Sequence, residues 1–73
     1  MKNNPLQTMK DVCKEYGISV EELVGRNRRS HLIRARKEAA KRMLEDGLRV
    51  SDIAFYLQRK YHNITHYFKG LKS

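Results

Sequence analysis

Four polar side chains suited to recognition chemistry lie close together near the C-terminal end of the chain. They are His62, Asn63, Thr65 and His66. An Asn amide can bond to two edge atoms of adenine, Thr offers a hydroxyl and a methyl group, and His can bond to a purine acceptor or a phosphate. We expect these side chains on the exposed side of a helix, where their types predict contacts with nucleic-acid bases.

The two histidines of this segment also have the i, i+4 spacing of a helical metal site. No Cys, Asp or Glu nearby supplies the third ligand that a zinc site requires. The chain has no Ser/His/Asp arrangement and no Gly-rich phosphate loop. We therefore expect no metal, no cofactor and no enzymatic activity, which leaves an ordinary exposed position or groove contact for His62 and His66.

Positive charge is concentrated in two parts of the chain. The chain has 16 Lys and Arg against 8 Asp and Glu, a formal net charge of +8. Eight of the basic residues fall between positions 26 and 42, with only Glu38 to oppose them, and no acidic residue follows Asp52. A clustered excess of this size predicts a polyanionic partner, most often nucleic acid, whereas general solubilisation would spread the charge evenly.

Three arginines occur within four residues in a predicted loop, residues 26–30. They are Arg26, Arg28 and Arg29. Their guanidinium groups repel one another unless an anion lies opposite, so this basic loop predicts contact with phosphates or a DNA groove. A solvated charge run is the alternative.

Length and composition limit the class of protein. Seventy-three residues form a single domain, residues 1–73, with little room for a deep, water-excluded active site. The chain has one cysteine, Cys13, so it cannot form an internal disulfide. Because Cys13 lies on or beside an apolar helix face, we expect it to be a small core residue. No apolar run approaches a membrane span, and the N-terminus lacks the apolar core of a signal peptide. We expect a cytoplasmic, nucleoid-associated protein that does not bind membranes.

Two short helices are predicted in the first third of the chain. Asn4 and Pro5 are suited to the cap and first position of a helix that Gly17 ends. Its apolar face contains Leu6, Met9, Val12 or Cys13, and Tyr16. Ser19 and Glu22 then form a capping box, which predicts a helix over residues 20–24 that Gly25 closes.

The longest predicted helix, at about residues 31–46, is the scaffold of the domain. Ser30 or His31 is its expected cap, and Gly47 its left-handed terminator. The apolar stripe consists of Leu32, Ala35, Ala39 and Met43, widened by Ala40 and Leu44. Basic side chains project on the opposite side, namely Arg34, Lys37 and Lys41. Glu38 is expected to pair with Arg42.

A helix pair at about residues 51–70 completes the all-α fold. Ser51 is the expected cap of its first helix, with Asp52 in the first turn, and Asn63 the cap of its second. The residues expected to face one another are Ile53, Leu57, Ile64 and Tyr67, with Ala54 at a close approach. Arg59 and Lys60 lie in the turn, and we expect both to contact DNA. This layout predicts a helix-turn-helix whose second helix enters the DNA major groove.

Nearly the whole chain, from about residue 12 to 71, resembles the C-terminal DNA-binding domain of the bacterial replication initiator DnaA, of the TrpR-like helix-turn-helix superfamily. VEELVGRNRRS resembles that family's short helix and basic loop, and IRARKEAAKRML the start of its scaffold helix. RVSDIAFYL resembles its first helix-turn-helix element, and His62 takes the histidine position of its Asp-His-Thr signature.

This resemblance implies two zones of DNA contact. Arg26 or Arg28 would reach the minor groove, and His62 with Asn63 would read bases in the major groove. The chain departs from the family at the turn, where the family's Gly-Gly is Gln58-Arg59, and at the signature, where its Asp is Tyr61 and its Thr pair is Asn63-Ile64. Similar free-standing modules accompany transposases and occur as small phage proteins.

Together these features predict a sequence-specific binder of double-stranded DNA, a small bacterial or phage regulator or accessory factor in replication or transcription. Phosphate contacts by the basic loop, Arg34 or Lys37 would position the domain, and residues 61–66 would select bases. A homodimer on DNA or a larger complex would add affinity. The alternative is a non-specific binder of nucleic acid such as RNA, or a basic adaptor for a protein partner.

Overall fold

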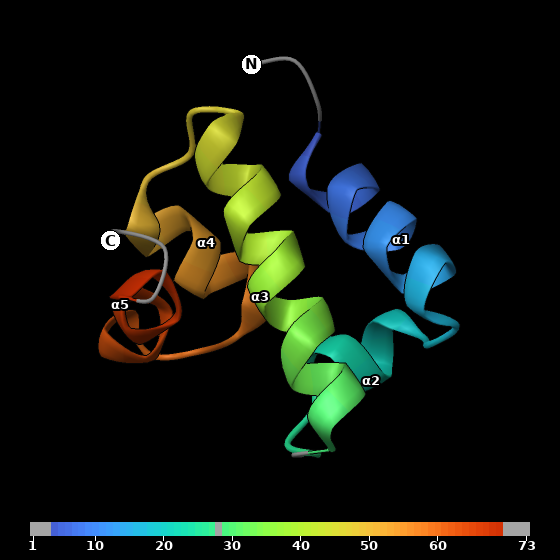
Figure 1. Ribbon diagram of the computed structural model, residues 1–73. Helices are drawn as coiled ribbons and strands as arrows, with labels where there is room; N and C mark the ends of the chain where they lie inside the picture. The colour runs from blue at the N-terminus through green and yellow to red at the C-terminus, as the bar shows by residue number, and fades with distance from the viewer. Residues whose placement is uncertain (1–3, 28, 70–73) are drawn as a thin grey trace.

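The computed structural model describes residues 4–27 and 29–69. This part of the chain folds into five helices and contains no strand, as the sequence predicts (Figure 1). The helices are α1 (Pro5–Tyr16), α2 (Val20–Val24), α3 (Ser30–Glu45), α4 (Val50–Leu57) and α5 (Tyr61–Lys69). Helix α3 runs through the middle of the molecule, with α1 on one side of it and the α4–α5 pair on the other (Figure 1).

The core lies where the other helices meet α3. It contains the predicted stripe residues Ala35, Ala39 and Met43 of α3, together with Met9 and Val12 of α1. The helix pair contributes Ile53, Ala54, Leu57 and Ile64, and α2 contributes Leu23. Alanines on α3 let its neighbours approach closely, as expected. Cys13 is buried among these residues, which confirms its prediction as a core position.

The predicted ends of α1 and α2 are confirmed. The Asn4 side chain accepts a hydrogen bond from the backbone N–H of Leu6 (2.8 Å), and Gly17 ends α1 with a left-handed φ of 67°. Ser19 Oγ accepts from the N–H of Glu22 (3.1 Å), while the Glu22 carboxylate accepts from the N–H of Ser19 (2.9 Å). Local capping chemistry alone therefore marks these two helices.

Two predicted core positions are wrong. Leu6 is 52% exposed and Leu44 is 42% exposed. The buried face of α1 instead includes Pro5 and Thr8, and Leu6 lies off its centre. The stripe of α3 is confined to residues facing its neighbours, which leaves Leu44 outside.

The residues predicted to cap the N-terminal ends of the other three helices are also wrong. Helix α3 begins at Ser30 itself, after a turn in which Asn27 Oδ1 accepts from the N–H of Arg29 (3.0 Å). Helix α4 begins one residue before Ser51, and the Asp52 carboxylate accepts from the N–H of Arg49 (3.2 Å). Asn63 is the third residue of α5. Leu48, just before α4, and Ile64, near the start of α5, are buried, so packing and not a capping side chain positions the chain at these two starts.

Three helices end in the same way. A residue of positive φ follows the helix, and the N–H of the next residue donates a hydrogen bond to the carbonyl five positions earlier. These residues are Gly17, Gly47 and Gln58, with φ of 67°, 98° and 54°. The following N–H groups of Ile18, Leu48 and Arg59 bond to the carbonyls of Cys13, Met43 and Ala54. Gly47 thus ends α3 as predicted, and Gln58 makes the same turn without being a glycine.

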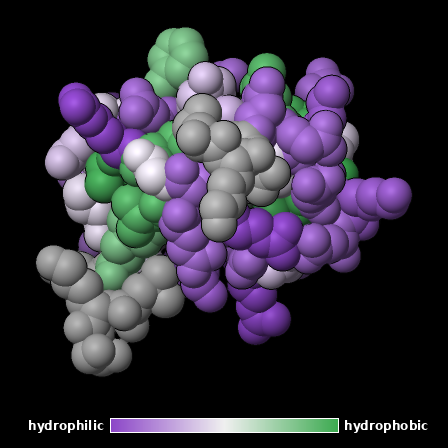
Figure 2. Space-filling model, turned by 90° about the horizontal axis from the view of Figure 1, so that it is seen from above, coloured by the Kyte–Doolittle hydropathy of each residue, from purple (hydrophilic) through white to green (hydrophobic). Residues whose placement is uncertain are grey.

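Hydrophilic residues cover most of the face shown in Figure 2, with hydrophobic residues in smaller patches between them. Besides Leu6 and Leu44, the described part exposes Phe55 (77%) and Tyr61 (59%). None of its helices combines the length and the apolar character that crossing a membrane requires.

Candidate functional site

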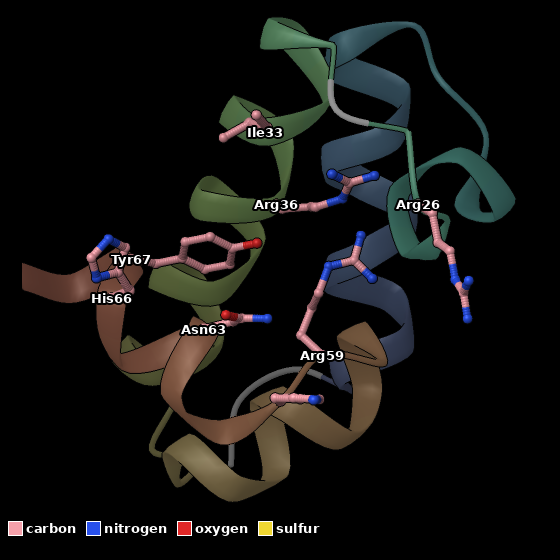
Figure 3. Close-up of a pocket in the computed structure, with 8 residues that line it drawn as sticks. Arg26, Ile33, Arg36, Arg59, Asn63, His66 and Tyr67 are labelled. Atoms are coloured by element: carbon pink, nitrogen blue, oxygen red, sulfur yellow. The ribbon is translucent and has the colours of Figure 1, made fainter.

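A groove of about 530 Å³ lies between the basic loop, α3 and the helix pair (Figure 3). We call it the basic groove. Its lining residues are Arg26, Ile33, Arg36, Arg59, Lys60, Asn63, His66 and Tyr67. None of these residues is acidic, and four carry a permanent positive charge. The groove is thus a hollow suited to an anion.

Helical spacing brings the walls of the basic groove together. Ile33 and Arg36 are i, i+3 on α3, and Asn63 is i, i+3 to His66 and i, i+4 to Tyr67 on α5. Each set therefore lies on one face of its helix. Ile64 of α5 points into the core instead and is fully buried, which turns the face bearing Asn63 toward the groove.

Arg36 forms the inner end of the basic groove, although it is buried (3% exposed). Its Nε donates to the carbonyl of Leu23 (2.6 Å), and its Nη2 donates to the carbonyls of Glu22 (3.1 Å) and Gly25 (2.9 Å). These carbonyls lie at and just beyond the C-terminal end of α2, where the helix itself supplies few N–H donors. The Glu22 carbonyl also accepts a hydrogen bond from the N–H of Gly25 (3.4 Å). Burial lowers the pKa of Arg36, and the nearby charge of Arg59 lowers it further, against a smaller opposing effect of Tyr67.

Arg59 reaches the same end of α2 from the turn between α4 and α5. Its Nη1 donates to the carbonyls of Val24 (3.1 Å) and Gln58 (3.2 Å), and its Nη2 donates to Gly25. Two arginines from distant parts of the chain therefore hold the start of the basic loop. The position of that loop relative to α5 depends on both of them.

The structure brings together five of the residues predicted to bind DNA. Arg26, Arg59, Lys60, Asn63 and His66 all line the basic groove. In Figure 3 the guanidinium group of Arg26 points outward, away from those of Arg36 and Arg59. His66 lies beside Tyr67, at the end of the groove opposite Arg26.

The remaining predicted residues lie elsewhere. Arg34 and Lys37 border a second hollow of about 280 Å³, which is also lined by Tyr16, Glu38, Lys41 and Tyr67. His62 and Arg29 are exposed but line neither hollow, and Thr65 is half-buried, with its hydroxyl donating to the carbonyl of His62 (2.8 Å). The predicted contact of Arg28 lies outside the described residues. Tyr67 borders both hollows and thus separates two basic surfaces.

Sequence reasoning did not identify Arg36 or Tyr67 as site residues. A signal for Arg36 existed, because it falls four residues after Leu32 and four before Ala40, inside the apolar stripe of α3. A charged side chain at a stripe position must find buried partners. The partners, backbone carbonyls of α2, have no signature in the sequence.

The described residues contain no group of three His, Cys, Asp or Glu side chains placed to hold a metal ion. Burial raises the pKa of the Cys13 thiol, and Glu22 raises it further. The thiol is therefore held in its protonated form, which suits packing and not nucleophilic attack.

Comparison of the chain with protein-family models, with curated proteins and with solved structures gave no match.

Proposed function

We propose that this chain binds double-stranded DNA in a sequence-specific manner, as a small bacterial or phage regulator or accessory factor. One observation carries the proposal. The basic groove places the cations Arg26, Arg59 and Lys60 beside the amide of Asn63 and the imidazole of His66, with no acidic residue in its lining. DNA recognition combines cations that position the DNA backbone with polar groups that read the base edges.

The α4–turn–α5 segment supports the same proposal. The two helices pack against each other and against α3, and the turn of residues 58–60 is short. In a helix-turn-helix, the first turns of the second helix meet base edges in the major groove. His62 is exposed and Asn63 is half-buried at the groove edge, both in the first turn of α5. We assign base contacts to these two residues, and phosphate contacts to Lys60 and Arg26.

Arg34 and Lys37 add a second set of phosphate contacts. They are exposed on α3 and border the hollow on the other side of Tyr67. Each phosphate neutralised releases a condensed cation, so the dependence of affinity on salt measures how many contacts form. We propose no catalytic role for the chain.

The first test is an unbiased selection from random duplex DNA, followed by titration of the enriched sequence against scrambled duplex at two salt concentrations. We expect a short enriched motif that stays bound at the higher salt. No enrichment, with affinity lost as salt rises, would contradict sequence-specific binding.

Single substitutions then separate the residues that position the DNA from the residues that read its bases. Lys60→Ala is expected to weaken binding to all sequences and to reduce the salt slope by about one. Asn63→Ala is expected to relax preference at one base pair, with a cost of about 1–3 kcal/mol for the preferred sequence only. Lys10→Ala is the matched control, because this exposed lysine lies on α1, across α3 from the helix pair. If Lys60→Ala and Asn63→Ala lowered the affinity for all DNA sequences equally, these separate roles would be refuted.

The exposed aromatic side chain of Phe55 favours a second candidate, an adaptor that binds a protein or RNA partner. Phe55 is 77% exposed and contacts Tyr56 edge-on at a centroid distance of 5.4 Å. Exposed aromatic rings are common in partner surfaces and in stacking platforms for unpaired bases. Competition between duplex DNA and RNA of the same length distinguishes the candidates, and Phe55→Ala would weaken only the adaptor or RNA mode.

A further inference from the structure

We propose that the inner end of the basic groove is a binding site for one phosphate group, held between Arg36 and Arg59 with the Tyr67 hydroxyl nearby. The proposal rests on the proposed function, since the phosphate would belong to a nucleic acid. It adds a specific recessed site to a surface that otherwise meets phosphates from outside.

The first argument is geometric. The guanidinium groups of Arg36 and Arg59 lie next to each other at the α2 side of the groove, and the Tyr67 hydroxyl points toward them from α5 (Figure 3). All three side chains line one continuous hollow of about 530 Å³, which is ample for a phosphate and its bridging oxygens.

The second argument is the set of hydrogen-bond donors left over. Arg36 uses Nε and Nη2 on α2 carbonyls, and Arg59 uses Nη1 and Nη2. Within residues 4–27 and 29–69, Arg36 Nη1 and Arg59 Nε have no hydrogen-bond acceptor. A guanidinium group presents its donors in a rigid, planar fork that matches phosphate oxygens. The carbonyls therefore fix both arginines in place and leave each of these two groove-lining residues with a donor that is not used within the described part of the chain.

The third argument is electrostatic. Arg36 is nearly fully buried, and buried charges in proteins are normally compensated by an opposite charge. Here the partners are carbonyl dipoles at the end of the five-residue helix α2, and none of the described residues that line the groove carries a carboxylate. Burial lowers the pKa of Arg36, and repulsion by the guanidinium group of Arg59 lowers it further. A bound phosphate would supply the missing negative charge and would stabilise the fold.

Inorganic phosphate alone tests the site without DNA. The backbone and Arg Nε–Hε signals of the ¹⁵N-labelled chain are followed by NMR during titration with phosphate, against chloride at matched ionic strength. We expect saturable shifts at Arg36, Arg59 and Tyr67, and a melting temperature that phosphate raises more than chloride does. Shifts that grow without saturation, or equally in chloride, would overturn the site.

Conservative substitutions in the groove sharpen the test. Tyr67→Phe removes one hydroxyl and is expected to weaken phosphate binding about fivefold, the equivalent of one hydrogen bond. Tyr61→Phe is the matched control, because the Tyr61 ring is 59% exposed and does not line the groove. Arg59→Lys keeps the charge and loses the fork, so it should weaken phosphate binding more than Tyr67→Phe does. Unchanged phosphate affinity in both groove variants would overturn the proposal.

The same NMR signals separate this inference from the proposed function. A motif found by DNA selection, without saturable phosphate shifts, would refute the phosphate site and leave the DNA proposal standing. Saturable shifts without an enriched duplex motif would support the site and refute sequence-specific binding. Duplexes with and without a 5′-phosphate identify the source, because an internal phosphodiester shifts Arg36 and Arg59 in both and a terminal phosphate only in the first.

Discussion

Arginines serve two opposite purposes on the two sides of α3. On the α1 side, Arg42 meets two carboxylates, with its Nη1 and Nη2 donating to Glu15 (2.9 and 2.8 Å) and its Nε to Glu38 (2.7 Å). On the side of the helix pair, the hydrogen bonds of Arg36 and Arg59 within the described residues go only to backbone carbonyls. One cation is compensated within the fold, and the other two are held in place without an opposite charge.

The pKa values show the difference. Hydrogen bonds from Arg42 to Glu15 and Glu38 raise the pKa of Arg42, whereas burial lowers the pKa of Arg36. A compensated arginine links helices, in this case α1 to α3. An uncompensated pair costs free energy unless a partner supplies negative charge. The contrast therefore separates the side of the molecule that maintains the fold from the side suited to an anionic partner.

The largest expected effect comes from removing the buried arginine. Arg36→Met is expected to lower the free energy of unfolding by about 3 kcal/mol, because carbonyls at the end of α2 lose a charged donor. Urea denaturation measures this loss. Arg34→Met, on the exposed side of the same helix, should change it by less than about 0.5 kcal/mol. Equal losses from the two variants would mean that Arg36 does not hold α2.

The compensated side should respond to pH. The hydrogen bond from Arg42 lowers the pKa of Glu15 below its ordinary value of 4.5. The ion pair therefore adds stability that is fully present above about 4.5 and is lost as pH falls through the lower, folded-state pKa. We expect Glu15→Gln to be less stable than the natural chain at pH 7 and to approach it in acid.

Urea denaturation of Glu15→Gln and the natural chain at a series of pH values measures that convergence. Glu21→Gln is its control, since Glu21 is exposed and makes no salt bridge within the described residues. A stability difference that stays constant with pH would contradict the role of the Arg42 pair. Added salt should also reduce the difference at pH 7, because the pair is partly exposed.

A second buried polar side chain, besides that of Arg36, shows what the lack of a hydrogen-bond partner costs when no charge is involved. Thr8 is 3% exposed, and its hydroxyl has no hydrogen-bond partner in the described part of the chain. Thr8→Val keeps the shape and removes the unpaired oxygen, so it should raise the free energy of unfolding by about 1 kcal/mol. Thermal denaturation measures the gain, and a loss of stability would show that the hydroxyl does have a partner.

The smallest expected effect concerns the turn that carries Arg59. Gln58 has φ of 54°, a left-handed conformation that glycine adopts without steric cost. Gln58→Gly is expected to raise the free energy of unfolding by about 0.5 kcal/mol, the steric gain less the added chain entropy. Binding of duplex DNA should not change, because Arg59 and not Gln58 fixes the turn to α2. A large change in DNA affinity would contradict that assignment.

Local chemistry made the first two helices predictable, and tertiary packing made the later ones less so. The Asn4 cap and the Ser19–Glu22 capping box depend only on neighbours in the chain, so their bounds were correct. Ser51 and Asn63 were expected to cap helices and lie inside them instead, because burial of side chains such as Ile64 decides where those helices begin. A capping side chain is a local preference that packing overrides.

The features of the candidate site likewise differ in whether local sequence or tertiary packing produces them. The all-α fold, the apolar stripe of α3, the left-handed end at Gly47 and the clustering of positive charge could all be predicted, since they follow from composition, spacing and local bonds. The burial of Arg36, the contact of Arg59 with α2 and the place of Tyr67 between two basic hollows arise only when distant segments pack together. The physical reason is that both arginines bond to backbone carbonyls. Every residue has such a carbonyl, so only folding determines which of them a distant side chain reaches.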